Sequence, residues 1–167
     1  MVKKFAHFCS AIFLFAAGSG FSENVAAETE KMSGTLLVGN KGEDSLSFID
    51  LASGKETARR NTGKQPHEIA ISPDGRLAAV VSYGGETIDI FDIAAMDRIE
   101  TVSLAPARRP HGIQWLDDGR ILATTEGSDN ITILSPPTGE AQRRKIANIA
   151  TGQQGSHMLV VTPDKSR

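Results

Sequence analysis

The sequence predicts an all-β fold built from a repeated unit of short strands, and three observations support this prediction. The 167 residues contain three copies of one motif at a nearly constant spacing, which is typical of repeat architectures. Glycine-containing turn sequences separate short apolar or alternating runs, which indicates strands joined by hairpins. No amphipathic helical pattern follows residue 27. The hydrophobic content of 40% is too high for a disordered chain.

The repeated motif is clearest at residues 66–76, which read PHEIAISPDGR. Residues 110–120, PHGIQWLDDGR, repeat it 44 positions later, and residues 156–165, SHMLVVTPDK, repeat it after a further 46. A second block follows the motif, because residues 77–93 match residues 35–51 at an offset of 42. The period therefore covers both blocks and is about the length of one supersecondary unit.

Each repeat is predicted to contain four strands in a fixed order. In the second repeat Asp74-Gly75 supplies the first hairpin turn, and Asp118-Gly119 does the same in the third. Four strands in about 40–45 residues make one blade of a β-propeller, and the near-constant period argues against the alternative of a β-sandwich. The strands predicted in the second repeat are residues 68–72, 77–82, 88–93 and 99–104, and in the third repeat they include residues 121–125 and 131–134.

The N-terminal segment is predicted to be a signal peptide covering residues 1–27. Lys3 and Lys4 precede a mostly apolar stretch that is too short to span a bilayer, and the small residues before Glu28 suit cleavage after Ala27. We therefore expect a periplasmic or secreted bacterial protein with no membrane span in the mature chain; the alternative is an uncleaved N-terminal anchor. Residues 28–34 form a linker, and residues 35–167 form the repeat domain.

Composition excludes several function classes for the mature chain. Removal of residues 1–27 takes away the single cysteine, Cys9, together with Lys3, Lys4 and Glu23, so the formal net charge changes from −2 to −3. A disulfide scaffold and a thiol enzyme are excluded. A strongly basic nucleic-acid binder is also excluded, and the four remaining aromatic residues are too few for a base-stacking surface. Nucleic acid is therefore not an expected partner.

The repeats resemble those of the YVTN-repeat β-propellers, which are exported proteins related to the YncE-type periplasmic propellers. The resemblance rests on residues 63–67 (GKQPH) followed by residues 71–76 (ISPDGR), and on residues 37–40 (LVGN) with residues 47–51 (SFIDL). It extends over residues 35–167. The fold it implies is similar to the propellers of cytochrome-type nitrite reductases and of lactonases, and it indicates a fold far better than a reaction.

The resemblance implies about seven blades, which need about 300 residues, so the predicted propeller is incomplete. The sequence supplies a first blade without its opening strand (residues 35–61), two whole blades (residues 66–104 and 110–146) and one further opening strand (residues 157–162). We expect a truncated, N-terminal portion of a longer propeller. Its unpaired strand edges and open blade faces also permit self-association of two copies.

Three histidines occupy one position of the repeat and are the main candidate site residues. His67, His111 and His157 each begin the first strand of a blade, and in propellers of this kind that strand lines the central channel. They are predicted to mark one mouth of the channel, where neutral imidazoles could hold a metal ion. The resemblance adds haem as a second possibility. The alternative is a structural role, in which each histidine caps a strand or bonds a loop.

Other polar residues are predicted near the same mouth. Arg108 and Arg109, just before the second of these histidines, could bind an anion, or could form an ordinary solvated pair. Asn40, Tyr83 and Glu126 fall near the ends of second strands and are weaker candidates for a polar rim.

The function predicted is that of a non-catalytic binding or scaffold propeller with a ligand or partner site at the channel mouth. No catalytic residue is predicted, because the sequence lacks a nucleophile elbow, a phosphate-binding glycine loop, HExxH and CxxC. No cofactor is expected, and the partner is a small ligand or a periplasmic protein. The alternative is a fragment of a lactonase-like or haem-dependent oxidoreductase-like enzyme, with a metal or haem held by His67, His111 and His157.

Overall fold

The computed structural model describes residues 32–139, 142–162 and 164. These residues belong to one compact unit, Lys31–Arg167. The predicted signal peptide, its cleavage site and most of the predicted linker lie outside the described residues. In the described part of the chain, no helix is long and apolar enough to cross a membrane.

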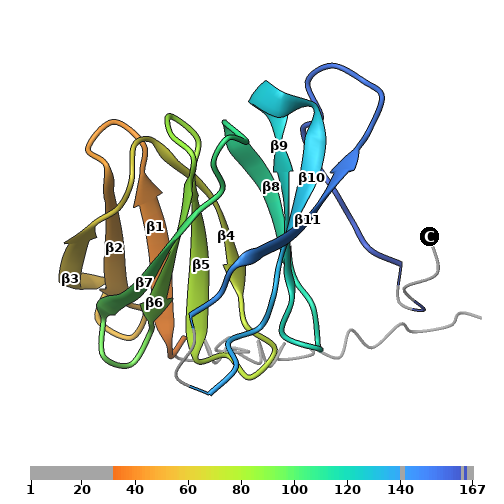
Figure 1. The fold of residues 1–167 in the computed structure, drawn as a ribbon. Coiled ribbons are helices and arrows are strands. Elements are labelled where there is room, and N and C mark those ends of the chain that lie inside the picture. The colour runs from red at the N-terminus through yellow and green to blue at the C-terminus, as the bar shows by residue number, and fades with distance from the viewer. Residues whose placement is uncertain (1–31, 140–141, 163, 165–167) are drawn as a thin grey trace, which may run out of the picture. The chain divides into compact units, whose positions relative to one another are not determined.

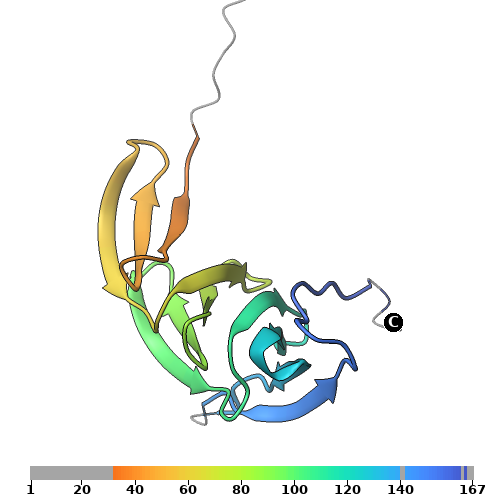
Figure 2. The ribbon, with the colours of Figure 1, turned by 90° about the horizontal axis from the view of Figure 1, so that it is seen from above.

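Three antiparallel sheets follow one another along the chain, as Figure 1 shows. The first has three strands in the order β1-β2-β3, and the other two have four strands each, in the orders β4-β5-β6-β7 and β8-β9-β10-β11. Viewed from above in Figure 2, the last strand of each sheet, β3, β7 and β11, lies on the outer side. The strands are β1 (Thr35–Asn40), β2 (Ser45–Asp50), β3 (Lys55–Asn61), β4 (Pro66–Ile71), β5 (Leu77–Ser82), β6 (Thr87–Asp92), β7 (Asp97–Ser103), β8 (Pro110–Trp115), β9 (Ile121–Thr125), β10 (Asn130–Leu134) and β11 (Lys145–Ala150), with a short 3-10 helix η1 (Glu126–Ser128) after β9.

This architecture confirms the predicted fold class, an incomplete β-propeller of antiparallel blades. The sheets are its blades, and among the described residues the first blade has three strands, without an opening strand. The Asp-Gly turns are also confirmed, since Gly75 and Gly119 have φ values of +73° and +84°, a region that glycine adopts without a steric penalty.

Two details of the sequence prediction are wrong. The third blade does not end near residue 146, because β11 continues to Ala150. Residues 157–162, predicted as the opening strand of a fourth blade, are not part of a strand ladder. A strand is defined by the neighbour that pairs with it, and the described residues include no second strand of a fourth blade.

The apolar core lies between successive blades. Leu46 and Phe48 of β2 pack against Val80 and Phe91 of the second blade, and the two phenyl rings meet edge to face with centroids 6.2 Å apart. A larger cluster joins the second blade to the third, and its members include Ile88, Ile90, Val102, Trp115, Ile121 and Leu134. Each blade therefore buries an apolar face on its neighbour, which fixes where the ends of their strands lie.

Candidate functional site

A recurrent backbone irregularity places the first two histidines. The pairing of β4 with β5 shifts register between Pro66 and Ile69, so His67 lies in a β-bulge. The pairing of β8 with β9 shifts at the equivalent place, and His111 lies in that bulge. A bulge bends its strand and changes the direction of a side chain. The two imidazole rings are neighbours, with centroids 4.1 Å apart.

The third histidine joins the same row. The centroid of the His157 ring lies 3.7 Å from that of His111, with an angle of 36° between the ring planes. The structure thus brings together all three predicted histidines, from two blades and the segment after the third. We call His67, His111 and His157 the histidine stack.

Close backbone packing against β8 holds His157 in the stack. The carbonyl oxygen of His157 accepts hydrogen bonds from the Gly112 N–H at 3.1 Å and from the Thr124 hydroxyl at 2.7 Å. A Cβ atom on Gly112 would lie 2.9 Å from that oxygen and 3.0 Å from Met158 Cα. Gly112 therefore permits an approach that a side chain would prevent. Further along, the Val161 N–H donates to the side chain of Gln114.

Residues that follow the second strands lie between the histidines. The Tyr83 ring is 5.5 Å from the ring of His67 and 5.6 Å from that of His111. One repeat later, Glu126 Oε2 is 3.7 Å from Nδ1 of His157. Each of these residues thus lies near the histidine that opens the next unit.

The first blade contributes Lys41 to this row, and not Asn40. Asn40 ends β1 as Ser82 ends β5, so the residue equivalent to Tyr83 is Lys41. Lys41 Nζ lies 4.9 Å from the centroid of the Tyr83 ring, whereas the amide of Asn40 donates to the hydroxyls of Ser45 and Ser47. The offset of 42 between residues 35–51 and residues 77–93 already aligns Lys41 with Tyr83 in the sequence.

Burial makes His111 the most constrained member of the histidine stack. It is 4% exposed, and its Nδ1 atom has no hydrogen-bond partner. Desolvation lowers the pKa of His111, and the neighbouring imidazoles of His67 and His157 lower it further, against the opposing effect of Glu126 and Glu68. His111 is therefore neutral at pH 7 and can act as an acceptor or a metal ligand.

Two overlapping sets of three residues have ligand atoms close enough to share a metal ion. One set is His67, Glu68 and His111, and the other is His111, Glu126 and His157. Within each set the ligand atoms lie within 4.8 Å of one another. Sequence reasoning identified the histidines but not Glu68 in this role, although its place directly after His67 was a usable signal.

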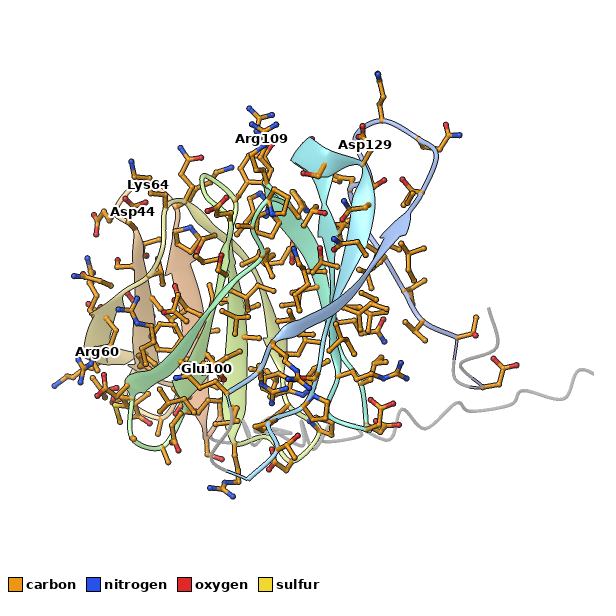
Figure 3. All side chains as sticks on the ribbon, viewed as in Figure 1. Asp44, Arg60, Lys64, Glu100, Arg109 and Asp129 are labelled. Atoms are coloured by element: carbon orange, nitrogen blue, oxygen red, sulfur yellow. The ribbon has the colours of Figure 1, made fainter. Side chains whose placement is uncertain are left out.

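Arg108 and Arg109 line a separate pocket beside the stack, and Figure 3 shows Arg109 at the same end of the sheets as Lys64 and Asp44. The pocket has a volume of about 490 Å³. Neither guanidinium group forms a hydrogen bond or ion pair with another described residue, and that of Arg109 lies 5.9 Å from the centroid of the Tyr83 ring. The remaining lining residues are Gly84, Gly85, Glu86 and Gly127.

Arg143, which the sequence did not single out, occupies the junction of the second and third blades. It is 8% exposed and stacks on Trp115 with its Cζ atom 4.6 Å from the ring centroid. Its guanidinium donates to the Gly119 carbonyl at 2.7 Å, and its backbone N–H donates to the Glu100 carboxylate. Burial lowers its pKa, and Glu100 opposes that effect. Its contacts are all with protein groups, so we assign it a structural role.

Comparisons with known proteins identify the fold. No protein-family model and no curated protein sequence match the chain. Among solved structures, hydrazine synthase of Kuenenia stuttgartiensis matches with 24% identity and a TM-score of 0.70, over 87% of this chain and 44% of that chain. The dihydro-heme d1 dehydrogenase NirN in complex with DHE matches with 20% identity and a TM-score of 0.60, over 74% and 26% of the two chains.

Streptogramin B lyase is a third match, with 17% identity and a TM-score of 0.62, over 78% of this chain and 42% of that chain. The chain thus spans less than half the length of each of these three structures. At such identities the likeness concerns the fold alone, which is that of a β-propeller.

Proposed function

We propose that this protein is an exported, non-catalytic binding propeller that holds a small anionic ligand at the channel mouth. One observation carries the proposal: Arg108 and Arg109 line a pocket, and the Arg109 guanidinium lies 5.9 Å from the Tyr83 ring, which is next to the rings of His67 and His111. Arginine presents planar, paired donors that match carboxylate and phosphate oxygens. The anion would complete the hydrogen bonding that the two guanidinium groups lack among the described residues.

The walls of the pocket favour a close approach by the ligand. Gly84, Gly85 and Gly127 have no side chains to fill it, and a Cβ atom on Gly127 would lie 3.3 Å from Cγ and Cδ of Arg109. Glu86 is the one carboxylate among the lining residues, so positive charge predominates. Such a balance attracts anions even though the mature chain is expected to carry a net negative charge.

Export and family membership stay predictions that support this proposal. The signal peptide, with cleavage after Ala27, accounts for the charged and apolar pattern of residues 1–27. The YVTN-type motifs suggest a periplasmic location. The alternative function is a propeller enzyme in which a metal or haem at the histidines does chemistry, and the catalytic motifs absent from the sequence make binding the preferred function.

Self-association through open blade edges is a further part of the proposal. Among the described residues β1 pairs with β2 alone, so its other edge can accept a strand from a second copy. Size-exclusion chromatography with light scattering tests this directly. A discrete dimer is expected, and a monodisperse monomer at all concentrations would contradict it.

Calorimetric titration of metal-stripped protein with citrate and with inorganic phosphate tests anion binding. We expect one of these anions to bind, and the double variant Arg108→Gln/Arg109→Gln to weaken binding at least about tenfold, because charge-assisted hydrogen bonds are lost. Arg76→Gln is the matched control, since it removes one positive charge in the β4–β5 turn, at the other end of the strand from His67. The proposal would be refuted if neither anion binds, or if Arg76→Gln weakens anion binding as much as the double variant does.

A further inference from the structure

We propose that His111, Glu126 and His157 form a binding site for a divalent transition-metal ion of the zinc and copper class. The site lies within the histidine stack and between the third blade and the segment that follows it. It is separate from the arginine pocket, and the proposal does not depend on anion binding there.

Unpartnered buried atoms are the first argument. Nδ1 of His111 and Oε2 of Glu126 are both buried, and neither has a hydrogen-bond partner. A carboxylate oxygen removed from water without compensation is destabilising, as is an imidazole nitrogen without a partner. Both atoms belong to side chains of the same three-residue set. A cation between them would satisfy both, whereas Ser82 Oγ, the third such atom among the described residues, lies outside the set.

The ligand types select the class of ion. Two imidazoles and one carboxylate suit zinc, copper or nickel, whereas magnesium and calcium prefer oxygen ligands alone. Three protein ligands leave a fourth position for water or for the neighbouring imidazole of His67.

The distances between the three ligand atoms are somewhat longer than in a metal site, and a small movement would shorten them enough to bind an ion. The ligand atoms lie within 4.8 Å of one another, whereas tetrahedral zinc needs about 3.3 Å between ligand atoms. His157 is the ligand that can close the difference, because its side chain is 59% exposed and its imidazole can rotate while its backbone stays docked on Gly112. Metal binding would therefore draw His157 toward Glu126, from which it is now 3.7 Å away.

The competing set, His67, Glu68 and His111, is less suited to hold the ion. The Glu68 side chain is 40% exposed, and that of Glu126 is 25% exposed. Water can solvate the carboxylate of Glu68, so a cation there has less to gain. Each carboxylate is grouped with two histidines of successive repeats, so the difference between the two sets lies in carboxylate burial. Glu126 is accordingly the residue that distinguishes the two sets.

Zinc titration of untagged protein, stripped with EDTA and measured in competition with a chromophoric chelator, tests the proposal. We expect one zinc ion per chain and an affinity that Glu126→Gln and His157→Ala each reduce at least about tenfold. Glu68→Gln is the matched control and should change the affinity less than twofold. Magnesium in excess should not compete with zinc.

The outcomes separate this proposal from the proposed function. Unchanged zinc affinity in Glu126→Gln, or an equal loss in Glu68→Gln, would overturn the assignment of this site. Because the His157 side chain is exposed, His157→Ala should keep the circular dichroism spectrum and remain a test even if Glu126→Gln is poorly folded. Citrate and phosphate binding is measured on metal-stripped protein, so loss of one activity leaves the other intact.

Discussion

Replacement of Gly112 by alanine should detach the segment that carries His157 without damaging the blades. The new Cβ atom would lie 2.9 Å from the His157 oxygen, 3.0 Å from Met158 Cα and 3.2 Å from the Leu159 nitrogen, all of which are backbone atoms. Ordinary contact begins at 3.4 Å, so the segment must move by about 0.5 Å or more. Gly112 has no positive φ, so the conflict is one of space alone.

The loss of docking free energy is estimated from the two hydrogen bonds that the His157 carbonyl oxygen accepts, from the Gly112 N–H and from the Thr124 hydroxyl. At about 0.5–1.5 kcal/mol each, their loss weakens docking of the segment by about 1–3 kcal/mol. That corresponds to an increase of about 5- to 150-fold in the population of undocked segment. Zinc affinity should fall by a similar factor, because His157 would leave the stack.

Hydrogen exchange measured by mass spectrometry is the assay. Peptides that include Val161 should exchange faster in Gly112→Ala, while peptides from β5 and β6 keep their protection. Gly42→Ala is the matched control, since nothing lies within 4 Å of the position of its Cβ atom. Thr124→Val tests the same contact without adding volume. Unchanged exchange and unchanged zinc affinity in both Gly112→Ala and Thr124→Val would refute the reasoning.

Three further predictions concern the core, a buried charge and pH. Phe91→Ala should lower the free energy of unfolding in urea by about 3–5 kcal/mol, because Phe91 is fully buried between the first two blades. Ile99→Ala, at an exposed position, should lower it by less than about 1 kcal/mol, and similar losses for the two variants would contradict the core assignment. Asp89→Ala should lower the free energy of unfolding, measured by thermal melting, by about 1.5–3 kcal/mol or more. The Asp89 carboxylate accepts hydrogen bonds from the Gly63 N–H at 2.7 Å and from the Thr101 hydroxyl at 2.6 Å. Unchanged stability would show that these bonds do not stabilise the contact between the loop after β3 and the second blade. For His111 the folded pKa lies below the ordinary value of about 6.5, so the unfolded chain binds more protons and the folded state loses stability as pH falls below that value. The melting temperature should therefore drop less between pH 7.5 and pH 5.5 in His111→Gln than in the unaltered protein, and an equal drop would show that this histidine does not contribute.

The sequence predicted the fold because each repeat carries its own local signals. Asp74-Gly75 requires a turn, and the apolar run after it requires burial on both faces, so strand and turn follow in order. The end of the third blade and the state of residues 157–162 could not be predicted in this way. Strand formation there depends on a neighbour, and periodicity shows that a segment can pair without showing that it does.

The histidines were predictable as a row, but their contact was not. The spacing of His67, His111 and His157 follows from the repeat, whereas the short distance between the first two rings depends on the bulge in β4 and β8, and the position of the third depends on close packing against β8. That bulge is a feature of register, which becomes visible only when two strands are paired. Lys41 is a different case, because the offset of 42 between the repeated blocks aligns it with Tyr83 in the sequence itself, and Asn40 was proposed one residue out of that alignment.

Chemical differences along the histidine stack arise from what lies between the histidines. The residues after the second strands are Lys41, Tyr83 and Glu126, which are a cation, a neutral phenol and an anion in successive blades. Every copy of the motif supplies one imidazole, but the residue that follows the second strand is a carboxylate only in the third blade, where Glu126 lies between His111 and His157. A cation is therefore attracted to one end of the row and repelled from the other, where Lys41 lies on Tyr83. The repeat supplies equivalent positions, and the residues that break its symmetry determine which ligand each position can bind.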